Sequence, residues 1–274
     1  MENLKQAKQL IADAEVVIVT AGNGLAQIEG LDILDKKDFQ NNFATVVQKY
    51  GVTNVQEALE YKFPSWQEQW LLWSQLIQEY TLNYQPSQTM QDLHYIIGRK
   101  KYFIATTTFA DFFERADFNG NRIFNVVGNW SEMQCSSGIN HGLHDDQQVV
   151  QTFIQAAKNH DLSAELVPKC EVCQQPLELH LPLNNHFYPE SDANSRFRWF
   201  LTGNEDKKVT VLELGVDEAS PQLFTPLVSL VEQFPQWSYV AADFSQDELP
   251  EVIQDRSAAV NADSATLIKS LAEK

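Results

Sequence analysis

The stretch Val16-Val17-Ile18-Val19-Thr20-Ala21-Gly22-Asn23-Gly24 decides the fold of this chain. Its first four residues are apolar and β-branched, and no polar residue alternates with them. Such a run is typical of a strand that is covered on both faces, as in a parallel sheet. The glycines that follow allow a tight turn and let backbone amides approach a phosphate closely. The stretch therefore predicts a first parallel strand that ends in a nucleotide-type turn.

Further apolar runs repeat this pattern along the chain, with helical spacing between them. They cover residues 102–105, 123–127, 209–212, 239–242 and 258–260. Strands that alternate with helices indicate βαβ units. We therefore predict an α/β protein with a Rossmann-like parallel sheet and helices on both faces, formed by residues 1–127 and 189–274.

Two segments depart from this alternation. Residues from about 36 to 91 have helical spacing and many aromatic side chains, so we predict a helical insert there. Trp66, Trp70 and Trp73 share one face of a helix in this insert, and we expect them to pack in the core rather than to line a ligand pocket. Residues 128–188 contain all three cysteines and several turn signals, and we predict a small zinc-type module there.

The composition excludes several classes of protein. The 274 residues carry a formal net charge of −17, and 43% of them are hydrophobic, which is sufficient for a packed core. The negative charge disfavours nucleic acid and anionic membranes as partners, because their phosphates would be repelled. An acidic rim for a basic partner is the alternative use of this charge. The sequence shows no signal peptide and no membrane-spanning run, so we expect a cytoplasmic protein.

Glycines and polar residues gather just after the predicted strands. In a doubly wound sheet, ligands bind at the carboxyl ends of the strands, near the point where the strand order reverses. We therefore expect the following residues to bind the nucleotide: Ala21, Gly22, Asn23, Gly24, Thr107, Thr108, Gly215, Val216 and Asp243. The alternatives are structural. Gly22 and Gly24 would then serve a plain turn. Thr107 and Thr108 would cap a helix, and Asp243 would be a solvated loop acid.

The three cysteines point to metal binding rather than to disulfides. Cys170 and Cys173 have the spacing of half a zinc knuckle, and Cys135 lies upstream of them. Three cysteines in an intracellular chain do not form a disulfide framework. Either His141 or His144 would complete a Cys3His zinc site. The alternative is that the cysteines are thiols without a metal.

An ordered set of motifs runs through the chain. It comprises Thr20 to Ala26 with Glu29-Gly30, Trp66 to Tyr80, residues 101–107, Gln134-Cys135-Ser136, the Cys170/Cys173 pair and residues 212–216. This set covers nearly the whole length and resembles the sirtuin family, in particular the macrodomain-linked bacterial sirtuins (class M). The resemblance implies NAD as cofactor, a structural zinc, and activity as an NAD-dependent protein ADP-ribosyltransferase or deacylase. It also implies a lipoylated H-protein-like carrier as protein substrate and a macrodomain protein as partner.

Several positions depart from the family pattern. Thr20 and Ala26 stand where the opening motif of the family has a glycine and a serine. Thr108 and Ala110 stand where the family has an asparagine and an aspartate. The catalytic histidine or glutamine of the family lies eight residues before the first zinc cysteine, and this position holds Val127. Valine can neither accept a proton nor bond a ribose hydroxyl.

Neighbouring polar residues are therefore the candidates for catalysis. Asp111 is adjacent to the expected acid, and Asn129 and Glu132 lie near the expected base. A second hypothesis is a catalytically inactive sirtuin-like module that binds NAD, ADP-ribose or a modified partner protein. A third is an unrelated nucleotide-binding α/β enzyme.

Overall fold

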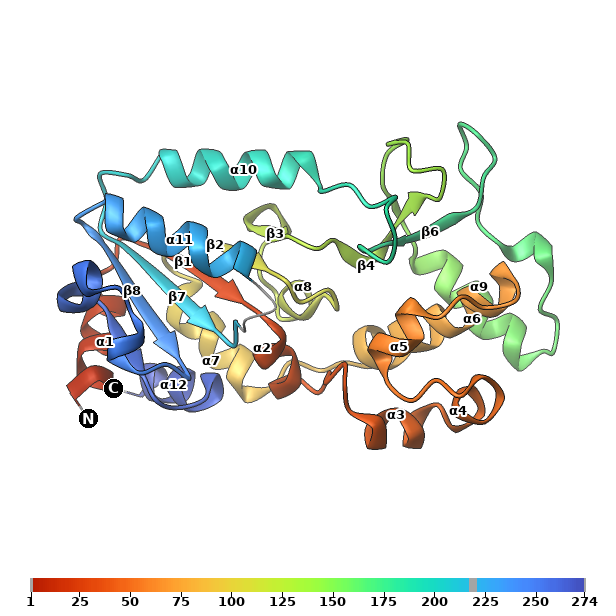
Figure 1. Ribbon diagram of the computed structural model, residues 1–274, viewed down its shortest axis with the longest axis horizontal. Coiled ribbons are helices and arrows are strands. Elements are labelled where there is room, and N and C mark those ends of the chain that lie inside the picture. Colours follow the sequence, from red (N-terminus) through yellow and green to blue (C-terminus); the bar gives the residue numbers. More distant parts are fainter. Residues whose placement is uncertain (1, 217–220, 274) are drawn as a thin grey trace.

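A six-stranded parallel sheet lies at one end of the molecule, on the left of Figure 1. The computed structural model describes residues 2–216 and 221–273. The strand order is β3-β2-β1-β7-β8-β9, and every neighbouring pair is parallel. The strands are β1 (Val16–Ala21), β2 (Lys101–Thr106), β3 (Ile123–Asn125), β7 (Val209–Leu214), β8 (Trp237–Ala242) and β9 (Ala258–Val260). The predicted strands and the Rossmann-like fold are thus confirmed. β3 ends two residues earlier than predicted, because the chain turns at Val126 and Val127 toward Gly128, whose φ is +78°.

Helices cover both faces of this sheet, which explains the continuous apolar strands. On β1, Val17 and Val19 belong to the core on one face, whereas Val16 and Ile18 belong to the core on the other. The first face is covered by α1 (Glu2–Asp13), α7 (Gln88–Ile97) and α12 (Ser264–Ala272), and the second by α10 (Ser191–Thr202) and α11 (Pro221–Gln233) (Figure 1).

A helical insert follows α2 (Asn23–Ile28), the helix after the glycine turn. It contains α3 (Lys36–Asn42), α4 (Ala44–Tyr50), α5 (Val55–Glu60), α6 (Trp66–Ile77) and a π-helical turn over Gln78–Leu82. Trp70 and Trp73 are buried with ring centroids 5.2 Å apart, and Trp66 packs on Trp73. The predicted core packing is confirmed for Trp70 and Trp73, whereas Trp66 is half-buried and borders a cavity together with Trp73. The Trp70 indole N–H also donates to the carbonyl of Leu177 at 3.0 Å, which ties the insert to the next segment.

That next segment, within residues 128–188, contains a small antiparallel sheet that the sequence did not predict. Its strand order is β5-β4-β6. The elements are β4 (Asn129–Cys135), β5 (His144–Asp145), α9 (Gln147–Lys158) and β6 (Leu177–His180). The short helix α8 (Phe112–Arg115) lies between β2 and β3 in the chain, and 3-10 turns occur at Gly120–Arg122, Ala164–Leu166, Gln246–Glu248 and Glu251–Arg256. α9 packs against α6, so the small sheet and the helical insert share one core.

Within the described ranges, no helix combines the length and the apolar character that a transmembrane span requires.

A buried carboxyl in β7 makes the stability of the fold depend on pH. Glu213 is 1% exposed and accepts a hydrogen bond from the Tyr239 hydroxyl. Burial raises the pKa of Glu213 from 4.5 to about 7, so near neutral pH the folded chain holds a proton that the unfolded chain has released. The stabilisation from the protonated Glu213 carboxyl is fully present below about pH 4.5. It is lost as the pH rises through about 7, and the loss in the free energy of unfolding is about 3 kcal/mol.

We expect Glu213→Gln to reduce this pH dependence. Urea unfolding at about pH 4.5 and about pH 8 should show a loss of stability that is about 3 kcal/mol smaller in the variant than in the wild type. Glu205→Gln, at an exposed position, should keep the wild-type pH dependence. An unchanged pH dependence in Glu213→Gln would contradict the assignment.

Candidate functional site

The candidate site lies at the carboxyl ends of the parallel strands, where the strand order reverses (Figure 1). β1 pairs with β2 on one side and with β7 on the other. The segments that follow these strands start from adjacent points at one edge of the sheet and diverge. Open parallel sheets bind ligands in the crevice formed at this reversal. The predicted nucleotide-binding residues 21–24, 107–108 and 215–216 all lie here.

Three glycines pack backbone against backbone in this crevice. The Gly22 N–H donates to the Leu214 carbonyl at 3.1 Å, and the Gly24 N–H donates to the Gly215 carbonyl at 2.9 Å. A Cβ atom on Gly22 would lie 2.5 Å from the Gly215 oxygen, and one on Gly24 would lie 2.7 Å from the Gly215 Cα. The contact between the two loops therefore requires these glycines even without a ligand. The amides of Gly22 and Gly24 already have backbone acceptors, so a phosphate at this turn would compete with the Leu214 and Gly215 carbonyls for them.

The threonines at the end of β2 are bonded to the glycine turn. The Thr107 N–H and the Thr106 hydroxyl both donate to the Ala21 carbonyl at 3.0 Å. The Thr106 hydroxyl also accepts from the Thr108 N–H at 2.9 Å and lies 2.7 Å from the Thr108 hydroxyl. All three threonines are buried. The structure thus brings Thr107 and Thr108 to Ala21, at the edge where the sequence places the nucleotide.

The two catalytic candidates, Asp111 and Asn129, are hydrogen-bonded to each other. The Asn129 side-chain amide donates to the Asp111 carboxylate, and its oxygen accepts from the Ser131 N–H at 2.8 Å. Asp111 precedes α8 with a φ of +56°, in the left-handed region where aspartate and asparagine are the most tolerated after glycine. Burial raises the pKa of Asp111, although hydrogen bonds from Ser131 and Asn129 oppose the shift. A carboxylate that is half-buried, held by an amide and raised in pKa accepts a proton more readily than an ordinary surface aspartate.

Two further acids near this pair were missed by sequence reasoning. Burial, with the Asp111 carboxylate, raises the pKa of Glu114 to about 7. Burial, with the carboxylates of Asp145 and Asp111, raises the pKa of Asp146 to about 8. Asp146 is 2% exposed, and its Oδ2 has no hydrogen-bond partner among the described residues. No local pattern identifies these acids, because their burial arises only when the small sheet packs beside α8.

Glu132, the other candidate for the base, lies beside a histidine. Its Oε2 is 3.5 Å from Nδ1 of His180, which is buried on β6. The His180 Nε2 atom is 2.8 Å from the Tyr188 carbonyl oxygen. The Glu132 carboxylate therefore lies beside His180 of the small sheet, whereas the Asn129 side chain is hydrogen-bonded to the other catalytic candidate, Asp111.

The remaining residues singled out from the sequence lie at separate points of the same edge. Val127 is half-buried in the turn before Gly128. Val216 reaches the glycine turn, since its Cα would be 2.9 Å from a Cβ on Gly22. Asp243 follows β8, two strands from β1, and its side chain is largely exposed. The partial burial of its carboxyl and the nearby Asp263 carboxylate raise its pKa. The structure thus brings Val216 to the crevice centre and leaves Asp243 at its flank.

A second cluster, in the small module, joins Cys135, His141, Cys170 and Cys173. Their potential ligand atoms all lie within 4.8 Å of one another. The Sγ atoms of Cys135 and Cys173 are 3.4 Å apart, and the Cys170 Sγ is 3.3 Å from the His141 Nδ1. Burial would raise the pKa of the Cys170 thiol, but hydrogen bonds from the backbone and from His141 outweigh it and lower the pKa to about 6. Three sulfurs and one imidazole nitrogen at this spacing fit tetrahedral zinc. The cluster includes His141 and not His144.

The zinc content of variants tests this choice of ligand. We expect about one zinc ion per wild-type chain, as in other closed four-ligand sites. His141→Ala should lower the zinc content well below one ion, because it removes a ligand. His144→Ala, three residues further on, should retain the wild-type content. Atomic absorption of dialysed protein measures both, and equal losses in the two variants would contradict the ligand set.

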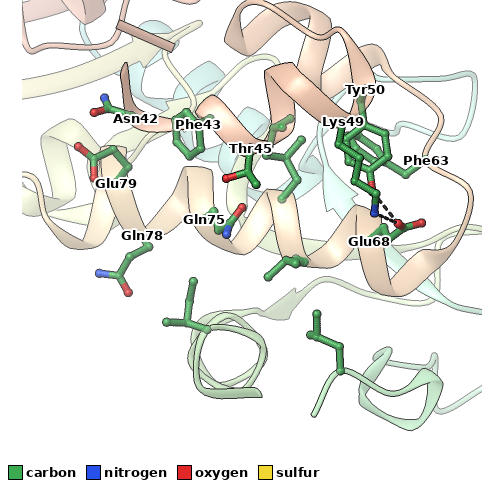
Figure 2. A pocket seen from close by; sticks show the side chains of 15 residues that line it. Asn42, Phe43, Thr45, Lys49, Tyr50, Phe63, Glu68, Gln75, Gln78 and Glu79 are labelled. Carbon is green, nitrogen blue, oxygen red and sulfur yellow. Dashed lines mark hydrogen bonds and ion pairs between the residues drawn. The ribbon is translucent and has the colours of Figure 1, made fainter. Parts of the chain in front are cut away.

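A cavity of about 560 Å³ lies apart from both sites (Figure 2), bordered mainly by the helical insert and on one side by Ile154 and Leu162 of the small module. α4 and α6 form its walls, and an ion pair between Lys49 and Glu68, with an N···O distance of 2.5 Å, joins the two helices at one end. Its size is within the range of small-molecule sites. None of its lining residues belongs to the strand-end crevice or to the cysteine cluster.

Comparisons of sequence place the chain near ADP-ribosyltransferases. A protein ADP-ribosyltransferase of Staphylococcus aureus (strain Mu50 / ATCC 700699) is 26% identical over 281 residues, which cover 97% of this chain and 87% of the relative. A protein of Fusarium oxysporum f. sp. cubense, named as a probable bifunctional ADP-ribose hydrolase/ADP-ribosyltransferase, is 22% identical over 231 residues. That alignment covers 80% of this chain but only 38% of the relative. No family model matches the chain.

Solved structures of Sir2 homologues share its fold over nearly the whole length. A complex of a Sir2 homologue with NAD has a TM-score of 0.63 at 16% identity, and covers 98% of this chain and 92% of its own. A mutant Sir2 homologue with ADP-ribose has a TM-score of 0.62 at 16% identity, with 98% and 94% covered. Sir2Tm bound to a propionylated peptide has a TM-score of 0.56 at 13% identity, with 97% and 95% covered. The chain therefore has the Sir2 (sirtuin) fold.

Proposed function

We propose that this chain is a sirtuin-type, NAD-dependent protein ADP-ribosyltransferase. The observation that carries the proposal is the hydrogen bond between half-buried Asp111 and buried Asn129, beside the crevice of a Sir2 fold. The pair supplies a proton acceptor at an edge where Val127 cannot. The relative from Staphylococcus aureus, a protein ADP-ribosyltransferase, supports the choice of transfer over deacylation.

The crevice has the chemistry to hold NAD. Two buried polar atoms near it, Thr20 Oγ1 and Asp146 Oδ2, have no hydrogen-bond partner among the described residues. A ligand rich in hydroxyl and phosphate oxygens would supply such partners. We propose that NAD is held by Ala21, Gly22, Asn23, Gly24, Thr107, Thr108, Gly215, Val216 and Asp243. For Gly22 and Gly24 this role would rest on close approach of the Cα atoms, since their amides are used by Leu214 and Gly215.

Asp111 and Asn129 would then have complementary roles in the reaction. When bound, NAD supplies the ADP-ribosyl group, with nicotinamide as the leaving group. Asp111 takes the proton of the acceptor side chain on its carboxylate. Asn129 orients that carboxylate through its amide. Glu114 and Asp146 hold protons of their own near neutral pH, so they do not add full negative charges beside Asp111.

The partners follow from the proposed class M character. The acceptor would be a protein, in particular a lipoylated H-protein-like carrier. A macrodomain protein would act as the companion that removes ADP-ribose. The Fusarium oxysporum relative, whose name joins a hydrolase and a transferase, supports such a companion. Zinc in the Cys3His cluster would be structural, and the NAD requirement favours a cytoplasmic location.

A transfer assay tests the proposal. Protein incubated with NAD that is labelled in its ADP-ribose part should transfer label to the lipoylated carrier, and the same carrier without lipoate is the matched control. Absence of label on any acceptor protein would count against the proposal.

A catalytically inactive NAD-binding module is the second candidate. The observation that favours it is the loss of polar side chains at Ala110 and Val127. Calorimetry with NAD and ADP-ribose should show binding under both candidates. NAD consumption distinguishes them, because the inactive module would bind NAD without releasing nicotinamide. A chain that binds neither ligand would contradict both candidates.

A further inference from the structure

One hydroxyl group in the helical insert bonds both segments that carry the Asp111–Asn129 pair. Thr81 is fully buried in the π-helical turn Gln78–Leu82. Its Oγ1 donates to the Ala110 carbonyl at 3.0 Å and accepts from the Trp130 indole N–H at 2.8 Å. Ala110 directly precedes Asp111, and Trp130 directly follows Asn129. Thr81 therefore fixes the spacing between the two segments next to their hydrogen-bonded side chains.

Aromatic packing makes this joint rigid. The Trp130 ring stacks on Tyr80 at 6.4 Å and meets the edge of Phe109 at 5.0 Å. The backbone N–H of Trp130 also donates to the Phe109 carbonyl at 3.2 Å. The indole lies between Tyr80 and Phe109, and its ring N–H donates to the Thr81 hydroxyl. Rotation of Trp130 would move the start of β4, and with it Asn129.

The π-helical turn contacts both the cavity of the insert and the segments that carry the Asp111–Asn129 pair. The turn closes with the Asn83 N–H donating to the Gln78 carbonyl at 2.9 Å, an i to i+5 bond that inserts one residue into the helix. Its first residues, Gln78 and Glu79, line the cavity of the insert (Figure 2), whereas Thr81 contacts the candidate active site. Such turns occur often at functional sites.

We propose that Thr81 is a positioning residue for the Asp111–Asn129 pair, and that the helical insert sets the geometry of this pair through it. The inference rests on the proposed transferase function. Thr81 touches neither substrate nor reacting atoms. It acts by holding the Ala110 carbonyl and the Trp130 indole, and thereby the backbone on either side of the pair.

Thr81→Val and Thr81→Ser test the inference together. Valine keeps the shape of threonine but removes the hydroxyl, whereas serine keeps the hydroxyl. We expect kcat for ADP-ribosyl transfer to fall by about tenfold to a hundredfold in Thr81→Val, with KM for NAD within about twofold of the wild type. Thr81→Ser should stay within about twofold in both constants. Ser74→Ala is the matched control, since this buried hydroxyl of α6 has no hydrogen-bond partner among the described residues and should leave both constants unchanged.

A spectroscopic readout keeps the inference testable without activity. In ¹⁵N-labelled protein, Thr81→Val should shift the Trp130 indole N–H and the Asn129 side-chain amide resonances, and Thr81→Ser should restore both. If the Asn129 resonances stay unchanged in Thr81→Val, the inference is wrong. It is also wrong if kcat is unchanged there, or falls equally in Ser74→Ala. If the wild type transfers no label, the proposed function fails, while the resonances still decide whether Thr81 positions the pair.

Discussion

Asp111→Asn is expected to lower kcat for ADP-ribosyl transfer by about a hundredfold or more, while the chain stays folded. Asparagine cannot take up a proton, so the proposed acceptor is lost. It tolerates the left-handed backbone at this position, where φ is +56°, about as well as aspartate does. The substitution also removes a half-buried carboxyl whose pKa is raised by its surroundings, so it should not destabilise the fold at neutral pH. Activity and thermal unfolding, measured on the same preparation, separate the two effects.

Asp117→Asn is the matched control for this variant. Asp117 has nearly the same backbone conformation, with a φ of +62°, but it is exposed on the surface beyond α8. It should transfer ADP-ribose at the wild-type rate. If Asp111→Asn transfers ADP-ribose as fast as the wild type, Asp111 is not the proton acceptor and another group must act as the base.

Gly215→Ala is expected to destabilise the fold by about 3 to 5 kcal/mol, the largest stability effect that we predict. Gly215 has a φ of +61°, and a Cβ there would lie 2.4 Å from the Leu25 nitrogen and 2.6 Å from Gly24. These neighbours are backbone atoms, so relief requires the β1 and β7 loops to separate. The free energy of unfolding from urea titration measures the loss.

Gly51→Ala separates the steric contact from the backbone conformation. Gly51 has a φ of +73°, but a Cβ there would meet nothing within 4 Å. It should cost only the left-handed penalty of about 1 to 2 kcal/mol. Equal losses in the two variants would mean that the loops do not pack as closely as the structure has them.

The parallel sheet was predictable because its strands carry their own signal. Runs such as 16–19 and 209–212 are buried on both faces and are therefore almost wholly apolar, Thr210 being the exception. β4 gives no such signal, since Asn129, Ser131, Glu132 and Gln134 are polar and find their partners only in the folded module. Its antiparallel pairing with β6, whose nearest residues lie about 40 positions away, depends on long-range contacts that no local pattern records.

The candidate site was predicted in position but not in detail. Sequence comparison with the sirtuin pattern placed Asp111 and Asn129 near the missing acid and base, but it could not show that they bond to each other. The choice between His141 and His144 was open because both spacings suit zinc, and the fold decides it in favour of His141. Thr81 gave no sequence signal, since a threonine within an aromatic helical segment looks like any other. The glycine turn was predicted as a phosphate cradle. The sequence could not show that the amides of Gly22 and Gly24 bond to the carbonyls of Leu214 and Gly215.

The measurement that tests the central claim most directly is the balance between nicotinamide released and ADP-ribose bound to protein. Wild-type chain, NAD and the acceptor would be incubated together, and both products quantified in the same reaction. We expect equal amounts of released nicotinamide and protein-bound ADP-ribose, and both should be reduced together in Asp111→Asn. NAD that remains unconsumed, or nicotinamide that appears while all ADP-ribose stays free in solution, would contradict it.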